Sequence, residues 1–214
     1  MQIYWIRAQA PRRVLALAKH LGLQVEYVHM DFRAGEMRRP DYAALNPNMR
    51  APTLVDGEYV LWESSAIMAY LSAKADADLW PADDIAKQIE ILRWLSWNDH
   101  HWAPAVAPYY FEHVVKPTFQ NALPDRSALP SKAAAVQTCA RVLNTHLEGS
   151  KYVAMNHLTI ADFQLASMAA YWRVSEMPFG DYPAIVEWLD RLTDLPAWRS
   201  PWPDRDDDSF LMAV

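Results

Sequence analysis

The chain has little cysteine: among its 214 residues only Cys139 carries a thiol. A single thiol excludes an internal disulfide framework and leaves no cysteine pair for a zinc site or a dithiol redox cycle. Cys139 lies within a stretch of helical character that runs from Lys132 to Leu147. We therefore expect a small buried hydrophobe at this position rather than a nucleophile.

Long apolar runs and basic clusters are also missing. Hydrophobic residues make up 52% of the chain, yet no uninterrupted run approaches the length that crosses a bilayer. Met1–Arg7 holds too short an apolar stretch for a signal peptide and is typical of a first strand. The net charge is −6, and the arginines of the N-terminal part are scattered. We expect a soluble cytoplasmic protein without a nucleic-acid or membrane partner.

The only adjacent histidines, His100 and His101, do not suggest a metal site. On a helix, neighbouring side chains point about 100° apart and cannot both face one ion. We predict that the protein holds no metal.

The chain divides into two parts by pattern. Residues 1–76 alternate strand and helix signals in a β-α-β then β-β-α order, whereas residues 84–214 follow a proline-containing acidic linker and look helical throughout. The sequence therefore predicts an α/β domain at 1–76 and an all-α domain at 84–214. The expected elements are strands at Gln2–Ile6 and Gln24–Met30 and helices at Pro11–Leu21, Asp41–Leu45, Ile85–Trp102, Ser127–Leu147 and Tyr182–Leu192.

The segment from Asn46 to Tyr70 predicts a hairpin with an open entrance. Pro52 has no N–H group, so the strand that starts at Thr53 is unpaired where the chain enters it. Asp56-Gly57 is a strong hairpin signal, and Tyr59–Trp62 returns antiparallel. We interpret this segment as a peptide-binding edge.

A helix begins directly after the hairpin, at Glu63-Ser64. Ser64 is a good N-cap, and the positive end of a helix attracts a carboxylate. Glu63 beside it suits an ammonium group, so the pair could hold the two charged groups of one amino acid. The alternative is an ordinary helix cap next to a solvated glutamate.

The motifs of this segment resemble the glutathione-site signature of cytosolic glutathione S-transferases, of a bacterial type with an atypical catalytic turn. The matching residues are Asn46-Pro47, Arg50-Ala51-Pro52-Thr53-Leu54 and Glu63-Ser64. The resemblance implies a thioredoxin-like fold for residues 1–76, a cis peptide at Pro52 and glutathione as co-substrate. It also implies that Ala51 pairs its backbone with the cysteinyl part of glutathione, beside Arg50, and that Glu63 and Ser64 hold the γ-glutamyl end.

A second motif lies in the helical part, at Leu158–Phe163. Thr159 can cap a helix, and Asp162 can reach back to it as in a capping box. This helix start is also similar to one in the C-terminal domain of glutathione transferases. Members of that family are commonly homodimers, so the resemblance implies a homodimer here.

The usual thiol-activating residue is absent from the first turn. A thiol with a pKa near 8.5 must be stabilised as thiolate at neutral pH. By resemblance the Ser or Cys of the family falls on Ala8, which offers no hydrogen bond. The open alternatives are the carboxamide of Gln9, backbone N–H groups of the turn and the positive potential of Arg12, with Tyr4 as a further candidate donor.

Aromatic side chains of the helical part predict an apolar substrate pocket. We expect most of them in the core, with Trp97, His101 and Tyr109 as pocket-wall candidates and Asp99 as a candidate contribution from a partner subunit. The tail from Pro203 to Val214 either frays or folds back over the cleft.

These features together predict a glutathione transferase-like enzyme of detoxification, acting as a homodimer. It would conjugate glutathione to a small hydrophobic electrophile, or reduce a peroxide with the same thiolate. The alternative is a non-catalytic glutathione-binding or protein-interaction module of the same fold, a reading that Ala8 favours.

Overall fold

The computed structural model describes residues 1–203, so both readings of the tail lie almost wholly outside the described residues. Its N-terminal part is a four-stranded sheet in the order β2-β1-β3-β4, with β1 and β2 parallel and the other pairs antiparallel. The strands are β1 (Gln2–Trp5), β2 (Glu26–His29), β3 (Thr53–Asp56) and β4 (Tyr59–Trp62). The helices of this part are α1 (Gln9–His20), α2 (Pro40–Leu45) and α3 (Ser64–Lys74).

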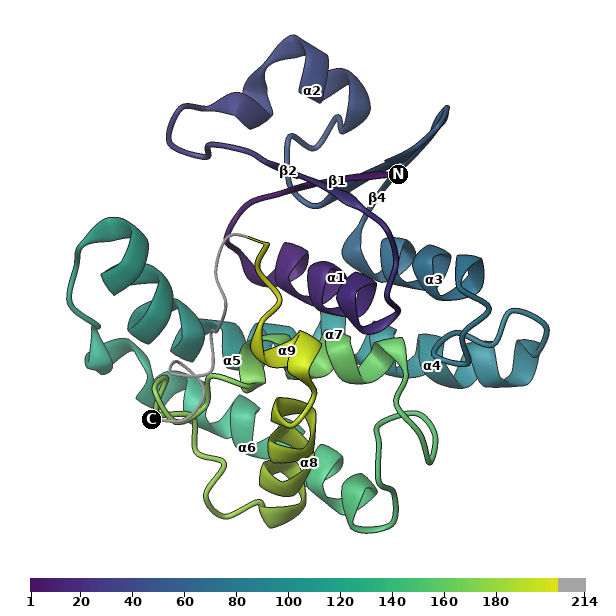
Figure 1. The fold of residues 1–214 in the computed structure, drawn as a ribbon. Coiled ribbons are helices and arrows are strands. Elements are labelled where there is room, and N and C mark those ends of the chain that lie inside the picture. The colour runs from purple at the N-terminus through teal and green to yellow at the C-terminus, as the bar shows by residue number, and fades with distance from the viewer. Residues whose placement is uncertain (204–214) are drawn as a thin grey trace.

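The sheet is covered on both faces, as Figure 1 shows: α2 lies on one side and α1 and α3 on the other. The alternation of β1 explains this, because successive side chains of a strand point to opposite faces. Ile3 and Trp5 are buried in the main core, whereas Tyr4 packs with Tyr42 of α2 at a ring distance of 5.6 Å. The predicted α/β domain with its hairpin is confirmed.

The predicted peptide-binding edge needs a correction. β3 is an inner strand, paired with both β1 and β4, so it is not the edge of the sheet. Both ladders end at Thr53, which pairs with Tyr4 on one side and Trp62 on the other. Ala51 lies just beyond these ladders, so the open backbone is the entrance to an inner strand.

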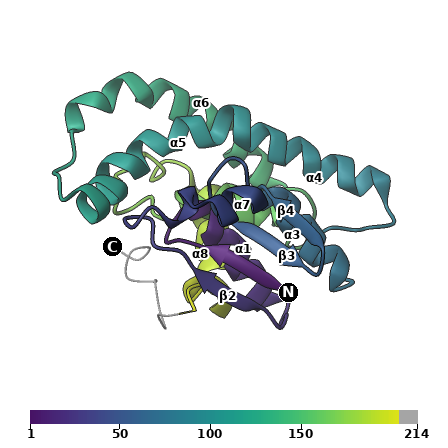
Figure 2. The same cartoon turned by 90° about the horizontal axis from the view of Figure 1, so that it is seen from above.

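The remaining described residues are helical. They form α4 (Ile85–Trp97), α5 (Ala103–Tyr110), α6 (Pro130–Glu148), α7 (Ile160–Ala169), α8 (Pro183–Thr193) and α9 (Pro196–Arg199). Figures 1 and 2 place this layer against the α1 and α3 side of the sheet, with α7 beside α1. The predicted all-α second part is confirmed in these elements, although the boundaries at 76 and 84 stay predictions.

The first helix of this layer is longer than predicted. α4 and α5 join through a π-helical turn at Asn98–Trp102, and a second π-helical stretch at Phe111–Gln120 carries the helix to Asn121, whose φ of 51° ends it. Prolines within and beside these stretches have no N–H for an ordinary helical bond, and wider turns are a known accommodation. Histidine rings donate to two carbonyls here: His100 Nδ1 lies 2.8 Å from the oxygen of Ser96, and His113 Nδ1 lies 3.2 Å from that of Tyr109.

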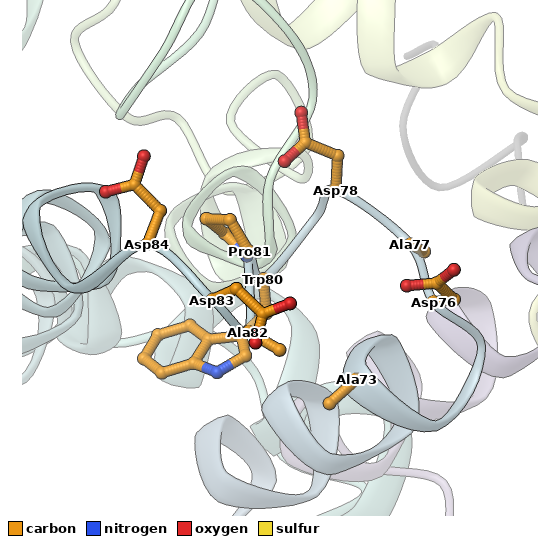
Figure 3. Close-up of a pocket in the computed structure, with 9 residues that line it drawn as sticks. All are labelled: Ala73, Asp76, Ala77, Asp78, Trp80, Pro81, Ala82, Asp83 and Asp84. Carbon is orange, nitrogen blue, oxygen red and sulfur yellow. The ribbon is translucent and has the colours of Figure 1, made fainter.

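The linker between the two layers carries four aspartates, Asp76, Asp78, Asp83 and Asp84. Figure 3 shows their carboxylates set apart around a shallow cavity of about 270 Å³ that Trp80 and Pro81 help to line. Asp84 accepts a 3.1 Å bond from the Lys87 N–H and so caps α4. Within residues 1–203 no group of three or more acidic, histidine or cysteine side chains is placed to hold a metal. Cys139 is buried, as expected, and burial raises the pKa of its thiol.

α7 is the central helix of the helical layer, and its start is held by one buried carboxylate. The predicted capping box is confirmed: Asp162 accepts from the N–H and hydroxyl of Thr159 at 2.8 and 3.0 Å. Its other oxygen accepts from the Val153 N–H and the Trp188 indole, both at 2.9 Å. Burial raises the pKa of Asp162 while these bonds oppose the change. None of the helices in the described part has the length and apolarity to traverse a bilayer.

We expect Asp162→Ala to lower the free energy of unfolding by about 3 kcal/mol or more, because several buried donors lose their acceptor together. Chemical denaturation followed by circular dichroism measures this loss. Asp181→Ala, at an exposed position, should stay within about 0.5 kcal/mol of the unmodified protein. Equal stabilities for the two variants would show that the carboxylate does not anchor α7.

Candidate functional site

A cavity of about 790 Å³ opens where α1, α3 and the entrance to β3 meet. Each of these elements contributes its beginning, so backbone N–H groups without helical or sheet partners face the same space. The segment between β2 and β3 closes the other side. The lining residues are Ile6, Ala8, Ala10, Arg13, Phe32, Arg33, Gly35, Met37, Arg38, Asn46, Asn48, Met49, Arg50, Ala51, Pro52, Glu63 and Ser64.

The cavity gathers the residues that the sequence motif nominated for ligand binding. Arg50, Ala51, Pro52, Glu63 and Ser64 all line it, although they come from two separate motifs. Ala8, at the position of the missing hydroxyl or thiol, lines the same space.

The charge of the lining favours an anion that also carries one positive group. The lining side chains include four arginines, and Glu63 carries the one carboxylate among them. Such a balance suits a small molecule with two carboxylates and an ammonium group, because each charge then finds an opposite partner.

Hydrogen bonds hold the backbone around Ala51 on the side that faces α2. The peptide between Ala51 and Pro52 is cis, as the resemblance implied. Asn46 Nδ2 donates one hydrogen bond of 2.8 Å to the carbonyl oxygen of Arg50 and one of 3.0 Å to the Thr53 hydroxyl. The Tyr42 hydroxyl donates 2.6 Å to the same Arg50 carbonyl. The segment that would pair with an extended ligand is therefore fixed on the side facing α2.

The predicted cap at Ser64 is wrong in detail. Glu63 has a φ of 72° and stands before the helix, so Ser64 is already the first residue of α3 and its hydroxyl makes no capping bond. Instead Ser64 Oγ accepts two bonds from Arg13, 3.0 Å from Nε and 2.7 Å from Nη2. The hydroxyl keeps its own proton, so it can donate to a carboxylate placed at the α3 N-terminus.

Arg13 is a site residue that the sequence analysis missed. It stands three residues after Ala10, and this spacing puts both on one face of α1, toward the cavity. Burial away from water lowers the pKa of Arg13 to about 10, and the negative charges of Asp99 and Glu63 oppose this change. Arg13 therefore stays charged at neutral pH. The negative charge of Asp99 in the same chain favours the charged form of Arg13.

Arg12, the neighbour that the sequence analysis nominated, turns away from the cavity. Its side chain is fully buried, and Nη2 donates 2.7 Å to the carbonyl oxygen of Trp198. The guanidinium lies over the Trp198 ring at 4.2 Å and over the Tyr171 ring at 5.6 Å. The expectation that Arg12 assists a bound sulfur does not fit this geometry, because helix phase directs the residue to the domain interface.

Gln9 also faces the helical layer. Its Nε2 donates 2.6 Å to the Tyr110 hydroxyl, and its two oxygens, carbonyl O and Oε1, each accept from Ser167 Oγ at 3.1 Å. Tyr4, the further candidate donor, lies on the α2 side of the sheet. At the turn itself, the N–H groups of Gln9 and Ala10 precede Pro11, and the first N–H groups of a helix have no intrahelical acceptor.

The three predicted pocket-wall residues do not line this cavity. Tyr109 belongs to the buried core. Trp97 packs against that core, with its ring 5.9 Å from that of Trp102 and 6.4 Å from that of His101, which is exposed. Tyr109 and Trp97 therefore contribute to core packing, and the place of these three residues in a substrate-pocket wall stays a prediction.

Comparison with known proteins gives two family-model matches. The model for the glutathione S-transferase N-terminal domain matches residues 1–73, and that for the C-terminal domain matches residues 102–196. Glutathione S-transferase 3 from Zea mays is 35% identical over 193 residues, covering 87% of this chain and 86% of the relative.

Solved structures agree. A theta-class glutathione S-transferase from Xanthomonas axonopodis pv. citri, with glutathione bound, has a TM-score of 0.80 at 27% identity and covers 95% of this chain and 97% of its own. Glutathione transferase F7 from Populus trichocarpa has a TM-score of 0.84 at 23% identity, covering 94% and 96%; this likeness shows the fold. The relatives come from plants and from a bacterium, so the bacterial-type qualifier stays a prediction.

We expect Asn46→Ala to lower the free energy of unfolding by about 2 kcal/mol, because the partly buried Arg50 carbonyl and the buried Thr53 hydroxyl each lose a donor. Tyr42→Phe should cost about 1 kcal/mol by removing the second donor to the same carbonyl. Denaturant titration measures both. Asn156→Ala, at an exposed position, is the matched control, and a cost for Asn46→Ala no larger than this control would contradict the assignment.

Proposed function

The chain belongs to the glutathione S-transferase family, and on that premise we propose that it binds glutathione in this cavity and transfers it to a small hydrophobic electrophile. One observation carries the proposal: both ligand-binding motifs and the first turn of α1 line a single cavity. The cytoplasmic location and the division into domains at 1–76 and 84–214 belong to the same proposal.

The peptide would lie extended along the entrance to β3. Its cysteinyl backbone would pair with the open backbone of Ala51, as in a β-ladder. The γ-glutamyl carboxylate would accept from Ser64 and the α3 N-terminus, near Arg13, and its ammonium group would face Glu63. Arginines of the segment from Arg33 to Arg50 would be left for the carboxylate at the other end.

The cysteinyl sulfur would then face the start of α1, beside Ala8. The thiol proton leaves to solvent, and the N–H groups and positive potential of the helix start stabilise the thiolate. The sulfur electron pair forms a bond to an electrophilic carbon, and the leaving group departs with its own electron pair. With a hydroperoxide, the same thiolate would attack the terminal oxygen, and the alcohol would leave as the O–O bond breaks. The thiol of a second glutathione would then attack the resulting sulfenic acid to give glutathione disulfide and water.

We expect the protein to bind glutathione in a calorimetric titration, and Ser64→Ala and Glu63→Gln each to weaken binding about tenfold or more. Each change removes a hydrogen bond to a charged group, which ordinarily contributes this much. Turnover is then measured with a chlorinated aromatic and with cumene hydroperoxide.

Two neighbouring substitutions serve as controls. Ser65→Ala and Glu58→Gln make the same chemical changes at positions that do not line the cavity, and they should leave binding unchanged. No binding by the unmodified protein would overturn the proposal. Binding without turnover of either substrate would select the non-catalytic module.

A homodimer is also part of the proposal, supported by one apolar stripe. Ile85, Ile89 and Leu92 recur at spacings of four and three on α4, and each is more than half exposed. A stripe of this kind on an otherwise polar helix face is typical of an interface. We propose that a second copy of the chain covers it.

Replacing Ile89 and Leu92 together with Glu should convert the dimer to a monomer, because a charge in an apolar interface is costly. Size-exclusion chromatography with light scattering measures the mass. Val142→Glu is the control, since Val142 is likewise exposed but lies on α6. The assignment of this stripe as the interface would be ruled out if the unmodified protein ran as a monomer. It would also be ruled out if the double variant stayed dimeric.

A further inference from the structure

Two loops present the same pair of side chains to the cavity. Phe32-Arg33 follows β2 and Met49-Arg50 precedes β3, and all four residues line the cavity. Phe32 is 66% exposed and Met49 is 45% exposed, so each loop sets a large apolar side chain next to a guanidinium group. This arrangement is complementary to a ligand that joins an apolar body to an anionic group.

The sheet topology brings both loops to the carboxyl end of β1. Because β1 and β2 are parallel, Arg33 follows the sheet at the same edge as Ala8. β3 is antiparallel to β1 and begins at that edge. The strand order β2-β1-β3 therefore sets Arg33 and Arg50 on opposite sides of Ala8, beside which the sulfur of bound glutathione would lie.

The guanidinium groups of these loops are available to a ligand. Arg33, Arg38 and Arg50 make no ion pair and no side-chain hydrogen bond with any residue in the part of the chain from 1 to 203. Asp31 accepts instead from two backbone N–H groups, at 2.8 and 3.0 Å, and Glu36 accepts from the N–H of Asp31 at 2.7 Å. These two carboxylates hold the backbone of the loop, and the positive charge of the three arginines faces the cavity.

Glutathione alone would not balance this charge. Near the three arginines it would offer one carboxylate, that of its glycine. Its thiolate adds a second negative charge, but only until the sulfur forms its bond to carbon. An anionic group on the electrophile would restore the balance, and a guanidinium binds a carboxylate through two parallel hydrogen bonds.

We propose that the electrophile carries a carboxylate and that Arg33 is the specificity-determining residue that binds it, while Phe32 packs against its apolar body. This inference deepens the proposed function and rests on it. Arg33 has this role rather than Arg50 because Arg50 adjoins Ala51, along which the peptide itself would lie.

The substrate class is then the small electrophilic aromatic acids. With a chlorinated acid, the thiol proton goes to solvent and the sulfur electron pair forms a bond to the ring carbon. Chloride leaves that carbon with its own electron pair. The carboxylate takes no part in the bond changes and serves only in recognition.

The test compares 4-chloro-3,5-dinitrobenzoate with 4-chloro-3,5-dinitrobenzamide, which share the reacting carbon and differ in charge. Each kcat/KM is divided by the rate constant of the uncatalysed reaction with glutathione. We expect the corrected value to be about fivefold or more higher for the benzoate at low ionic strength. The preference should shrink to less than about twofold in about 0.5 M salt, because ions screen exposed charges.

Substitutions locate the preference. Arg33→Gln should reduce it to less than about twofold, whereas Arg33→Lys keeps the charge and should retain part of it. Arg39→Gln is the matched control and should leave the preference unchanged, because Arg39 pairs with Asp41 and does not line the cavity. As a second readout, calorimetry on the glutathione-loaded protein compares the Kd of 3,5-dinitrobenzoate with that of 3,5-dinitrobenzamide, which lack the leaving group.

The outcomes separate this inference from the proposed function. A preference for the acid that is lost in salt and in Arg33→Gln supports the inference. Equal corrected rates, or equal affinities if neither chlorinated compound turns over, overturn it while glutathione binding stands. A preference that survives Arg33→Gln overturns the assignment to Arg33. Absence of glutathione binding by the unmodified protein overturns both proposals.

Discussion

The phase of α1 is the constraint on which the rest of the structure depends. This helix lies between the sheet and the helical layer, and its first residues must serve the cavity and the domain interface together. Ala10 and Arg13 share the face toward the cavity, whereas Arg12 points to α9. A shift of one residue in α1, which is a rotation of about 100°, would move Arg13 off the cavity face and Arg12 off the interface, so both surfaces fix the same helix rotation.

The interface holds this rotation with contacts made by a buried cation. A fully buried guanidinium is costly unless polar partners and aromatic faces surround it. Arg12 has a carbonyl from Trp198 and the rings of Trp198 and Tyr171. Lys19, further along α1, donates to the carbonyl oxygens of Ser200 and Trp202. The segment after α8 therefore contacts α1 near both of its ends, and these contacts join the two layers into one unit.

What could be predicted from the sequence was local in the chain. The hairpin and the α7 capping box each depend on residues a few positions apart, whereas the cis peptide at Pro52 was implied by the family resemblance. The motifs around Pro52 and Glu63 contain Arg50, Ala51 and Glu63, which line one cavity. The choice between Arg12 and Arg13 needed the partner elements, because Trp198 lies 186 positions from Arg12. Ser64 lines this cavity, but its predicted role as a cap failed because Glu63, with a φ of 72°, stands before the helix and Ser64 is already its first residue. The place of Trp97, His101 and Tyr109 in a substrate-pocket wall stays a prediction, since spacing on one helix does not say which face a second helix covers.

This division between local and distant contacts has a consequence for the chemistry. The groups that line the cavity all come from residues 6–64, so the peptide can be held by the α/β domain alone. The turn beside Ala8 is different, because Gln9 is oriented by Ser167 and joined to Tyr110, both of the helical layer. The proposed binding therefore depends on residues of one layer, whereas the orientation of the first turn depends on the packing between the two layers. A change that loosens the interface without unfolding either layer should separate the two, since the binding groups would keep their geometry while the turn lost the contacts that orient it.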